Sequence, residues 1–139
     1  MTYVFGGVSK NRLTGVHPDL AACAEKALSY GLMDFSVAQG VRTDQQQVDL
    51  YEQGRTKPGK IVTWTLKSNH LLQADGYGHA IDLVPYIGGK QNWDDLQNFH
   101  FLATMMFRAA MELGVSIGWG GHWTKNKDYP HFELLKKGD

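Results

Sequence analysis

The sequence is poor in the features that mark nucleic-acid-binding or disulfide-stabilised proteins. Lys and Arg together number 14, as do Asp and Glu, so no global positive field attracts nucleic acid or anionic lipid. A single cysteine, Cys23, excludes an intrachain disulfide, and its alanine neighbours favour a helix packed in the core. We therefore expect no nucleic-acid partner and no structural disulfide.

Long hydrophobic stretches are also lacking. No apolar run approaches the ~20 residues that span a bilayer, so we expect no integral membrane segment. Residues 1–11 show no cationic start followed by an apolar stretch, which indicates synthesis in the cytoplasm without an export signal. With 42% hydrophobic and 20% charged residues, the composition is typical of one globular domain, which we expect to span residues 1–139.

Three helices are predicted from their caps and from periodic apolar residues. The first runs from residue 17 to Gly31, because Pro is tolerated in a first helical turn and Asp suits its positive end. Thr43 and Gln46 form a capping box that opens the second, which extends to about residue 53. The third spans residues 94–113, where apolar residues recur every three or four positions until Gly114 ends the pattern.

Short strands are expected at residues 35–39, 80–84, 115–119 and 131–134, with Pro85 and the following glycine pair stopping the second. Residues 54–68 are rich in Gly, Pro, Lys and Thr and show no helical or strand-like repeat of apolar residues. We therefore expect a long surface loop that borders a site. This order of elements predicts an α+β domain in which helices pack on a small antiparallel sheet.

Histidines and acidic residues gather between residues 68 and 131. Successive strand side chains point to opposite faces, so His79 and Asp82 should not bind the same ion. Asp82, with His70 before it and His131 far along the chain, supplies two imidazoles and one carboxylate. That donor set suits a hydrolytic Zn²⁺ with an open position for water. Asp128 precedes His131 by three residues across a Pro-containing turn, a spacing that can place a general base beside the metal.

Most of these residues also have a structural interpretation. His70 could be an exposed loop histidine and His131 a satisfied core histidine, whereas a lone buried carboxylate at Asp82 is costly without a partner. Asp128 could cap a turn. Glu133, which shares a strand face with His131, is then the rival base.

Three segments give the chain a resemblance to a known family. They are Ser68-Asn69-His70, Gly78-His79-Ala80-Ile81-Asp82 and Asp128-Tyr129-Pro130-His131, and further similarity extends from residue 17 to residue 134. In these segments the chain resembles the peptidoglycan-cleaving zinc peptidases. That family includes D-Ala-D-Ala carboxypeptidases and dipeptidases and the L-alanyl-D-glutamate endopeptidases of phage endolysins.

The resemblance implies a set of residue roles. His70, Asp82 and His131 would bind Zn²⁺ in a cleft, and Asp128 would be the general base. Arg42 would stabilise the oxyanion, although by itself it could be a surface ion-pair residue. Ser68 would support the site by hydrogen bonding.

Asp rather than Glu at the base position favours a zinc-dependent L-alanyl-D-glutamate endopeptidase, a phage-type endolysin that hydrolyses peptidoglycan stem peptides and lyses the host cell. The alternatives are a D-Ala-D-Ala carboxypeptidase or dipeptidase, and a zinc-binding domain of the same fold that has lost hydrolysis. We expect a monomer without a separate wall-binding domain, which a holin releases to the cell wall.

Two departures from the family pattern bear on the site. Seven residues, 71–77, separate His70 from Gly78 where the family has two, so the loop after the first ligand is longer. In addition, His122 stands in a segment where related endolysins more often place Asp, and we expect it near the cleft, touching substrate or competing for metal. Trp119 and Trp123 flank the site and could line a peptide groove.

Overall fold

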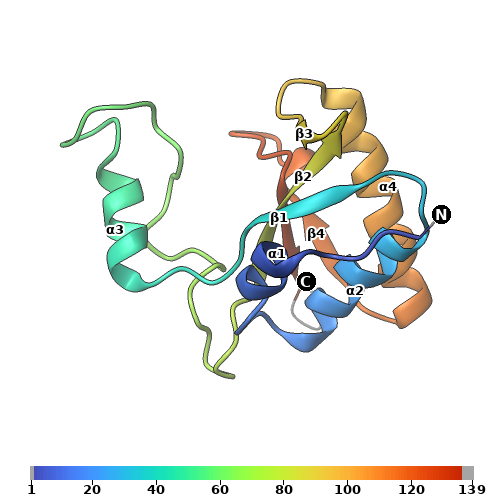
Figure 1. Cartoon of the computed structure of the whole chain (residues 1–139). Coiled ribbons are helices and arrows are strands. Elements are labelled where there is room, and N and C mark those ends of the chain that lie inside the picture. Colours follow the sequence, from blue (N-terminus) through green and yellow to red (C-terminus); the bar gives the residue numbers. More distant parts are fainter. Residues whose placement is uncertain (1, 136–139) are drawn as a thin grey trace.

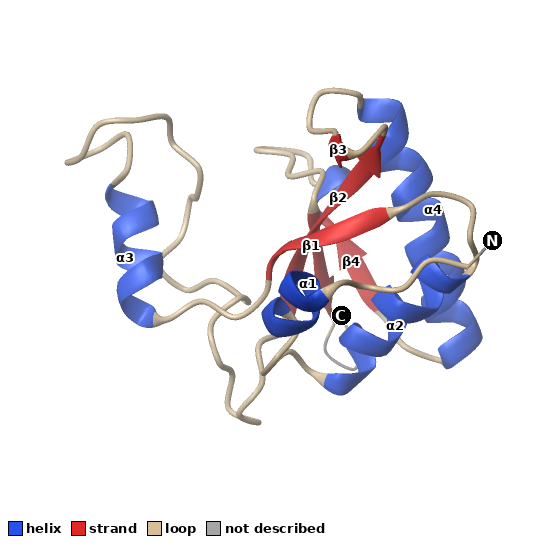
Figure 2. Cartoon of the chain, viewed as in Figure 1, coloured by secondary structure: helices blue, strands red, loops and turns tan. Residues whose placement is uncertain are grey.

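An antiparallel sheet with helices packed against it forms the body of the molecule in the computed structural model, which describes residues 2–135 (Figures 1 and 2). In chain order the elements are α1 (Gly7–Arg12), α2 (Pro18–Ser29), β1 (Phe35–Gln39), α3 (Asp44–Glu52), β2 (Ala80–Ile87), β3 (Lys90–Gln91), α4 (Leu96–Leu113), β4 (Ile117–Trp119), the 3₁₀ turn η1 (Gly120–His122) and β5 (His131–Leu134). The predicted α+β arrangement is confirmed.

The order of strands in the sheet is β1-β2-β5-β4, and β3 pairs with the far end of β2. All of these pairings are antiparallel. Asp82 on β2 lies directly opposite His131 on β5 and is also paired with Gln39 at the end of β1. The sheet register therefore places two residues that are 49 positions apart in the sequence side by side.

Helices α2 and α4 pack on each other beside the sheet, and α4 contacts β2 and β4 (Figure 1). The buried face of α4 comprises Phe99, Leu102, Ala103, Met105, Met106, Ala109 and Ala110. The predicted apolar stripe is confirmed in the middle of the helix, but its end members Leu96 and Leu113 are exposed. Cys23 is fully buried in α2, as expected. The caps are as predicted too, because Pro18 opens α2 and Gly114 ends α4 in the left-handed conformation, with φ 71°.

Three local features differ from the sequence-based expectations. β2 continues through Pro85 to Ile87, because Gly88 and Gly89 (φ 63° and 82°) turn the chain into a tight hairpin with β3 rather than ending the strand. The strand expected at 115–119 begins only at Ile117. Helix α1 was not predicted, since it has six residues and buries only Ser9, which is too little for a periodic pattern.

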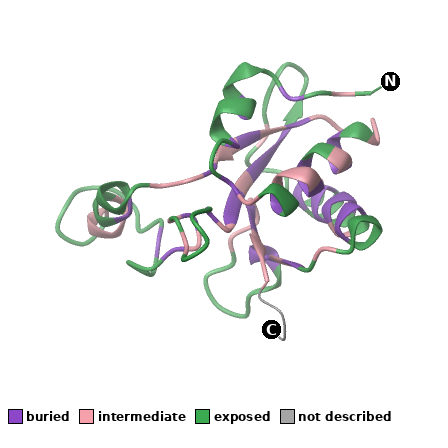
Figure 3. Cartoon of the chain, turned by 90° about the horizontal axis from the view of Figure 1, so that it is seen from below, coloured by how far each residue is buried: buried purple, intermediate pink, exposed green. Residues whose placement is uncertain are grey.

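The arm, which consists of α3 and residues 53–68, stands away from the sheet (Figure 1). Figure 3 shows that most of it is exposed, and Gln47 is the one buried residue of α3. The capping box of Thr43 and Gln46 is present as predicted. Among the described helices, none combines the length and apolar character that a membrane span needs.

Candidate active site

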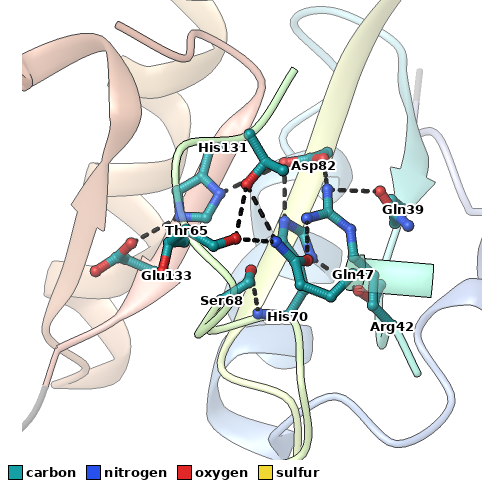
Figure 4. Close-up of polar contacts among 11 residues, drawn as sticks. Gln39, Arg42, Gln47, Thr65, Ser68, His70, Asp82, His131 and Glu133 are labelled. Carbon is teal, nitrogen blue, oxygen red and sulfur yellow. Dashed lines mark hydrogen bonds and ion pairs between the residues drawn. The ribbon is translucent and has the colours of Figure 1, made fainter. Parts of the chain in front are cut away.

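His70, Asp82 and His131 converge on one point at the end of the two central strands, β2 and β5 (Figure 4). Asp82 Oδ1 lies 3.3 Å from His70 Nε2 and 3.6 Å from His131 Nδ1. One donor atom from each of the three residues lies within 4.8 Å of the other two, a spacing at which the group could hold a metal ion. β2 and β5 supply Asp82 and His131, and the segment before β2 supplies His70.

A backbone contact orients His70. Its Nδ1 lies 2.8 Å from the carbonyl oxygen of Gly40, which can only accept a hydrogen bond, so Nδ1 carries the proton and Nε2 keeps a free lone pair. Gly40 must be glycine here, since a Cβ atom at this position would lie 1.8 Å from the carbonyl oxygen of Arg12. The free nitrogen of His70 therefore points at Asp82.

His131 is oriented from the opposite side by a carboxylate. Its Nε2 lies 2.7 Å from Glu133 Oε1, so Nε2 donates and Nδ1 is the nitrogen that faces Asp82. A carboxylate behind a histidine is the usual arrangement that fixes the tautomer of a metal ligand. Glu133, the alternative general base, is thus hydrogen-bonded to His131.

The electrostatics of the cluster favour a cation. Burial opposes ionisation of Asp82, but the imidazoles of His131 and His70 outweigh burial and hold its pKa well below the usual range. Burial also opposes a charged His131, yet Asp82 and Glu133 raise the pKa of His131 to about 9. His70 Nε2 and Asp82 Oδ1 are buried without a hydrogen-bond partner, and a metal ion would satisfy both. The residues therefore fit a bound metal.

Asp128 lies beside this cluster on the wall of the cleft. Burial and the charge of Asp82 raise its pKa above the usual range. Its backbone packs on Gly120, whose carbonyl oxygen accepts the Asp128 N–H at 3.1 Å. A Cβ atom at Gly120 would lie 2.1 Å from the Asp128 carbonyl oxygen, so this approach requires glycine.

Arg42 reaches the cluster from the turn between β1 and α3. Its Nη2 lies 3.7 Å from Asp82 Oδ2 and donates to Gln39 Oε1 at 2.8 Å. Its Nη1 donates to Gln47 Oε1 at 2.9 Å, and Figure 4 shows both amides flanking the guanidinium. The side chain is only 12% exposed, so Arg42 belongs to the site and not to the open surface.

These groups open into a cleft of about 450 Å³ between the arm and the segment before β5. Its lining comprises Arg42, Ile61, Val62, Thr63, Trp64, Thr65, Lys67, Ser68, Asn69, His70, Trp123, Asn126, Lys127, Asp128, His131 and Glu133. The loop expected to border a site, residues 54–68, does so.

Comparison with known proteins assigns the family. Residues 1–137 match the family described as phage L-alanyl-D-glutamate peptidase. The chain belongs to this family. The L-alanyl-D-glutamate peptidase of Escherichia phage T5 is 34% identical over 136 residues, which cover 98% of this chain and 92% of that protein.

Two bacterial relatives agree with this assignment. The peptidoglycan L-alanyl-D-glutamate endopeptidase CwlK of Bacillus subtilis is 34% identical over 120 residues, which cover 83% of this chain and 66% of that protein. The crystal structure of the Serratia marcescens L-Ala D-Glu endopeptidase ChiX matches with a TM-score of 0.79 and 35% identity, covering 96% of this chain and 90% of that chain. The L-alanyl-D-glutamate peptidase activity expected from the sequence is thus that of the family.

Residues 71–77, which we expect to lengthen the loop after His70, leave His70 in the cluster with Asp82 and His131. Residues 73–76 form a tight turn, in which Gly76 N donates to the Gln73 carbonyl oxygen at 2.9 Å. Asp75 holds the turn by accepting a 2.7 Å hydrogen bond from His79. Ser68 Oγ accepts the backbone N–H of His70 at 3.1 Å.

The structure does not place Trp119 and His122 in the cleft. Trp119 is 4% exposed, stacks on Phe132 in the core and donates through Nε1 to the Tyr129 carbonyl oxygen at 2.7 Å. His122 stacks on Phe107 of α4, with ring centroids 5.5 Å apart, and lies outside the metal cluster. The expected placement of these two side chains in the cleft was wrong, because Trp119 packs from β4 into the core and His122 packs from η1 onto α4. Trp123 does line the cleft.

Sequence reasoning missed the part played by Gln47. It is 1% exposed, and besides accepting from Arg42 it donates to Thr63 Oγ1 at 3.1 Å and to the Thr65 carbonyl oxygen at 2.7 Å. The available signal was its place one turn into a capped helix that follows Arg42 closely. A glutamine at this place in a helix is predicted to face solvent, and only the structure shows that residues 63–65 pack against it.

Proposed function

We propose that the protein is a zinc-dependent L-alanyl-D-glutamate endopeptidase that hydrolyses peptidoglycan stem peptides. In this proposal His70, Asp82 and His131 hold the metal, Asp128 is the general base and Arg42 stabilises the oxyanion. The observation that carries it is the convergence of three oriented donor atoms, two of them buried without a partner, beside a carboxylate of raised pKa.

Two nitrogens and one carboxylate oxygen are a ligand set that zinc takes in hydrolytic enzymes. When bound, Zn²⁺ supplies Lewis acidity, which polarises the scissile carbonyl and makes water a better nucleophile near neutral pH. The hydrogen bonds from His70 to Gly40 and from His131 to Glu133 fix the lone pairs that the chain offers. Both ligands are thereby held in advance, at no cost of reordering when the ion binds.

In this proposal Asp128 transfers the proton of the attacking water, and Arg42 stabilises the negative charge of the oxyanion. The attacking water forms a bond to the carbonyl carbon of L-Ala and gives one proton to the Asp128 carboxylate. As the bond to nitrogen breaks, Asp128 passes that proton to the leaving amine of D-Glu. Arg42, fixed by Gln39 and Gln47, presents a positive charge toward the oxygen that becomes negative.

Metal content combined with product mass tests the proposal. Purified protein should hold about one zinc per chain, and digestion of peptidoglycan should release stem peptides that begin with D-Glu. Asp128→Asn should retain zinc and lose about 100-fold to 10,000-fold in turnover. An Asp128→Asn protein that binds zinc and cleaves normally would refute the base assignment.

The same measurements decide the alternatives. Loss of a terminal D-Ala from the stem would identify a D-Ala-D-Ala carboxypeptidase, and zinc binding without any turnover would identify a non-catalytic domain. The presence of both the ligand set and an adjacent free carboxylate supports hydrolysis.

The proposal also covers where the protein acts. We retain the expectations of a monomer and of release to the wall by a holin, as part of host-cell lysis. Light scattering of the purified protein tests the first. Lysis that depends on co-expression of a membrane-permeabilising protein tests the second.

A further inference from the structure

Large apolar side chains stand exposed on the arm where it borders the cleft. Trp64 is 59% exposed, Val62 53% and Ile61 40%, and all three line the cleft. Exposed apolar groups gathered at a concave site mark a binding surface. We refer to residues 61–64 as the rim.

The rim is held in position from both sides of Trp64. Gln47 donates to the side chain of Thr63 and to the carbonyl of Thr65, the two neighbours of Trp64. Arg55 donates to the Thr63 carbonyl oxygen at 3.1 Å, and its guanidinium lies 5.6 Å from the centroid of the Trp64 ring. The indole is therefore presented to solvent by a fixed backbone, which lowers the ordering cost of binding.

A second aromatic residue stands closer to the metal ligands. Trp123 is 38% exposed, lines the same cleft and lies with its ring centroid 5.0 Å from that of His131. Trp123 is thus placed against the reacting peptide, whereas Trp64 belongs to the arm. The cleft therefore holds a second exposed indole, that of Trp64, in addition to that of Trp123 beside His131.

The chemistry of the substrate indicates what Trp64 would meet. In peptidoglycan the amino group of L-Ala is joined through a lactyl ether to N-acetylmuramic acid, so only one residue separates the scissile bond from a sugar. One residue spans at most about 3.6 Å and the lactyl group adds a link of similar length, so the sugar lies roughly 7 Å from the scissile bond, within reach of the cleft that Trp64 lines. Its lactyl carboxyl is taken up in the amide, so the sugar is neutral, and none of the four rim residues, 61–64, carries a charge. Stacking of an apolar sugar face on an indole suits this pair better than charge.

We infer that Trp64 is a sugar-binding platform for the N-acetylmuramic acid that carries the stem peptide. This inference rests on the proposed function, because it takes the bond after L-Ala as the one cleaved. It makes the enzyme selective for stem peptides still attached to glycan, with the rim holding the sugar while the metal site holds the first peptide bond.

Two substrates with the same peptide separate sugar binding from catalysis. One is a disaccharide tetrapeptide, and the other is that tetrapeptide with an acetylated N-terminus and no sugar. The zinc-loaded wild type should show the higher kcat/KM on the first. Trp64→Ala should raise KM for the first about fivefold to tenfold and leave the kinetics on the second unchanged.

Trp93→Ala is the matched control, because Trp93 is 46% exposed and does not line the cleft. It should behave as wild type on both substrates, and Trp64→Phe should recover part of the loss. Equal loss on both substrates, or no loss on the sugar-bearing one, would overturn the inference. Failure of the proposed function is recognised separately, since the wild type would then release no peptide that begins with D-Glu.

Discussion

Glu133 accepts a 2.7 Å hydrogen bond from His131 Nε2, which leaves His131 Nδ1 as the nitrogen that faces Asp82. The pairing lowers the pKa of Glu133, first through the hydrogen bond from His131 itself. A carboxylate held in this way is a poor acceptor for a proton from water. Asp128, whose pKa burial raises and whose side chain lines the cleft, is better suited to that step.

Removal of Glu133 should therefore weaken metal binding rather than proton transfer. Glu133→Ala is expected to lower zinc affinity about 10-fold to 100-fold, because His131 loses the partner that fixes its tautomer. Competition against a chromogenic chelator measures the affinity. Turnover at saturating zinc should stay close to that of the wild type. Glu25→Ala, an exposed residue of α2, is the control. Unchanged zinc affinity with abolished turnover would instead make Glu133 the base.

The members of the His70, Asp82 and His131 cluster could be picked out from the sequence because each sits in a short local pattern. Strand alternation alone separated Asp82 from His79, and in the structure His79 pairs with Asp75 away from the metal cluster. The register that sets Asp82 opposite His131 could not be predicted, since it depends on which strands pair.

Contacts between distant backbone segments were equally beyond a reading of the sequence. Gly40 fits against Arg12, and Gly120 fits against Asp128, at distances that no residue with a Cβ atom allows. In the sequence both are ordinary turn glycines. Their importance comes from the segment that packs on them, which only the folded chain reveals.

Gly120→Ala should displace Asp128 without removing any metal ligand. Its Cβ atom would lie 2.1 Å from the Asp128 carbonyl oxygen, so the backbone of Asp128 must move. A shift near 1 Å in a catalytic group can cost about 100-fold in rate, and we expect a loss of kcat of that order. Steady-state kinetics and zinc analysis check the result.

Gly118→Ala is the matched control for that substitution, because a Cβ atom there meets first the flexible end of Leu135, at 3.1 Å. It should retain most of the activity. Wild-type kcat in Gly120→Ala would show that Asp128 need not hold the position seen in the structure.

The thiol of Cys23 should be inert in the folded protein. It is fully buried in α2, and burial together with the charge of Asp19 raises its pKa to about 11. A raised pKa disfavours the thiolate, the reactive form, so only about one thiol in 100 is ionised at pH 9. Labelling by a thiol reagent should be slow at pH 8 to 9 and become fast on unfolding in guanidinium. Rapid labelling of the native protein would contradict the helix packing around Cys23.

Gln47 joins the arm to Arg42 and should affect the rate although it lies outside the reacting groups. Gln47→Met keeps the size and the helix propensity but removes the contacts to Arg42, Thr63 and Thr65. We expect kcat to fall about 10-fold to 100-fold on the sugar-free peptide, since Arg42 loses one of the amides that fix it. The same kinetics on Gln45→Met, an exposed residue of α3, provide the control.

Kinetics on the two substrates separate the effect of Gln47 on Arg42 from its effect on the position of the rim, residues 61–64. Loosening of Arg42 lowers kcat on both substrates, because the oxyanion forms in each. Loosening of Trp64 adds a rise in KM that is confined to the sugar-bearing substrate. A rise in KM of that kind with unchanged kcat would mean that Gln47 serves the arm alone and that Gln39 suffices to hold Arg42. Unchanged kinetics on both would contradict a role for Gln47 in either.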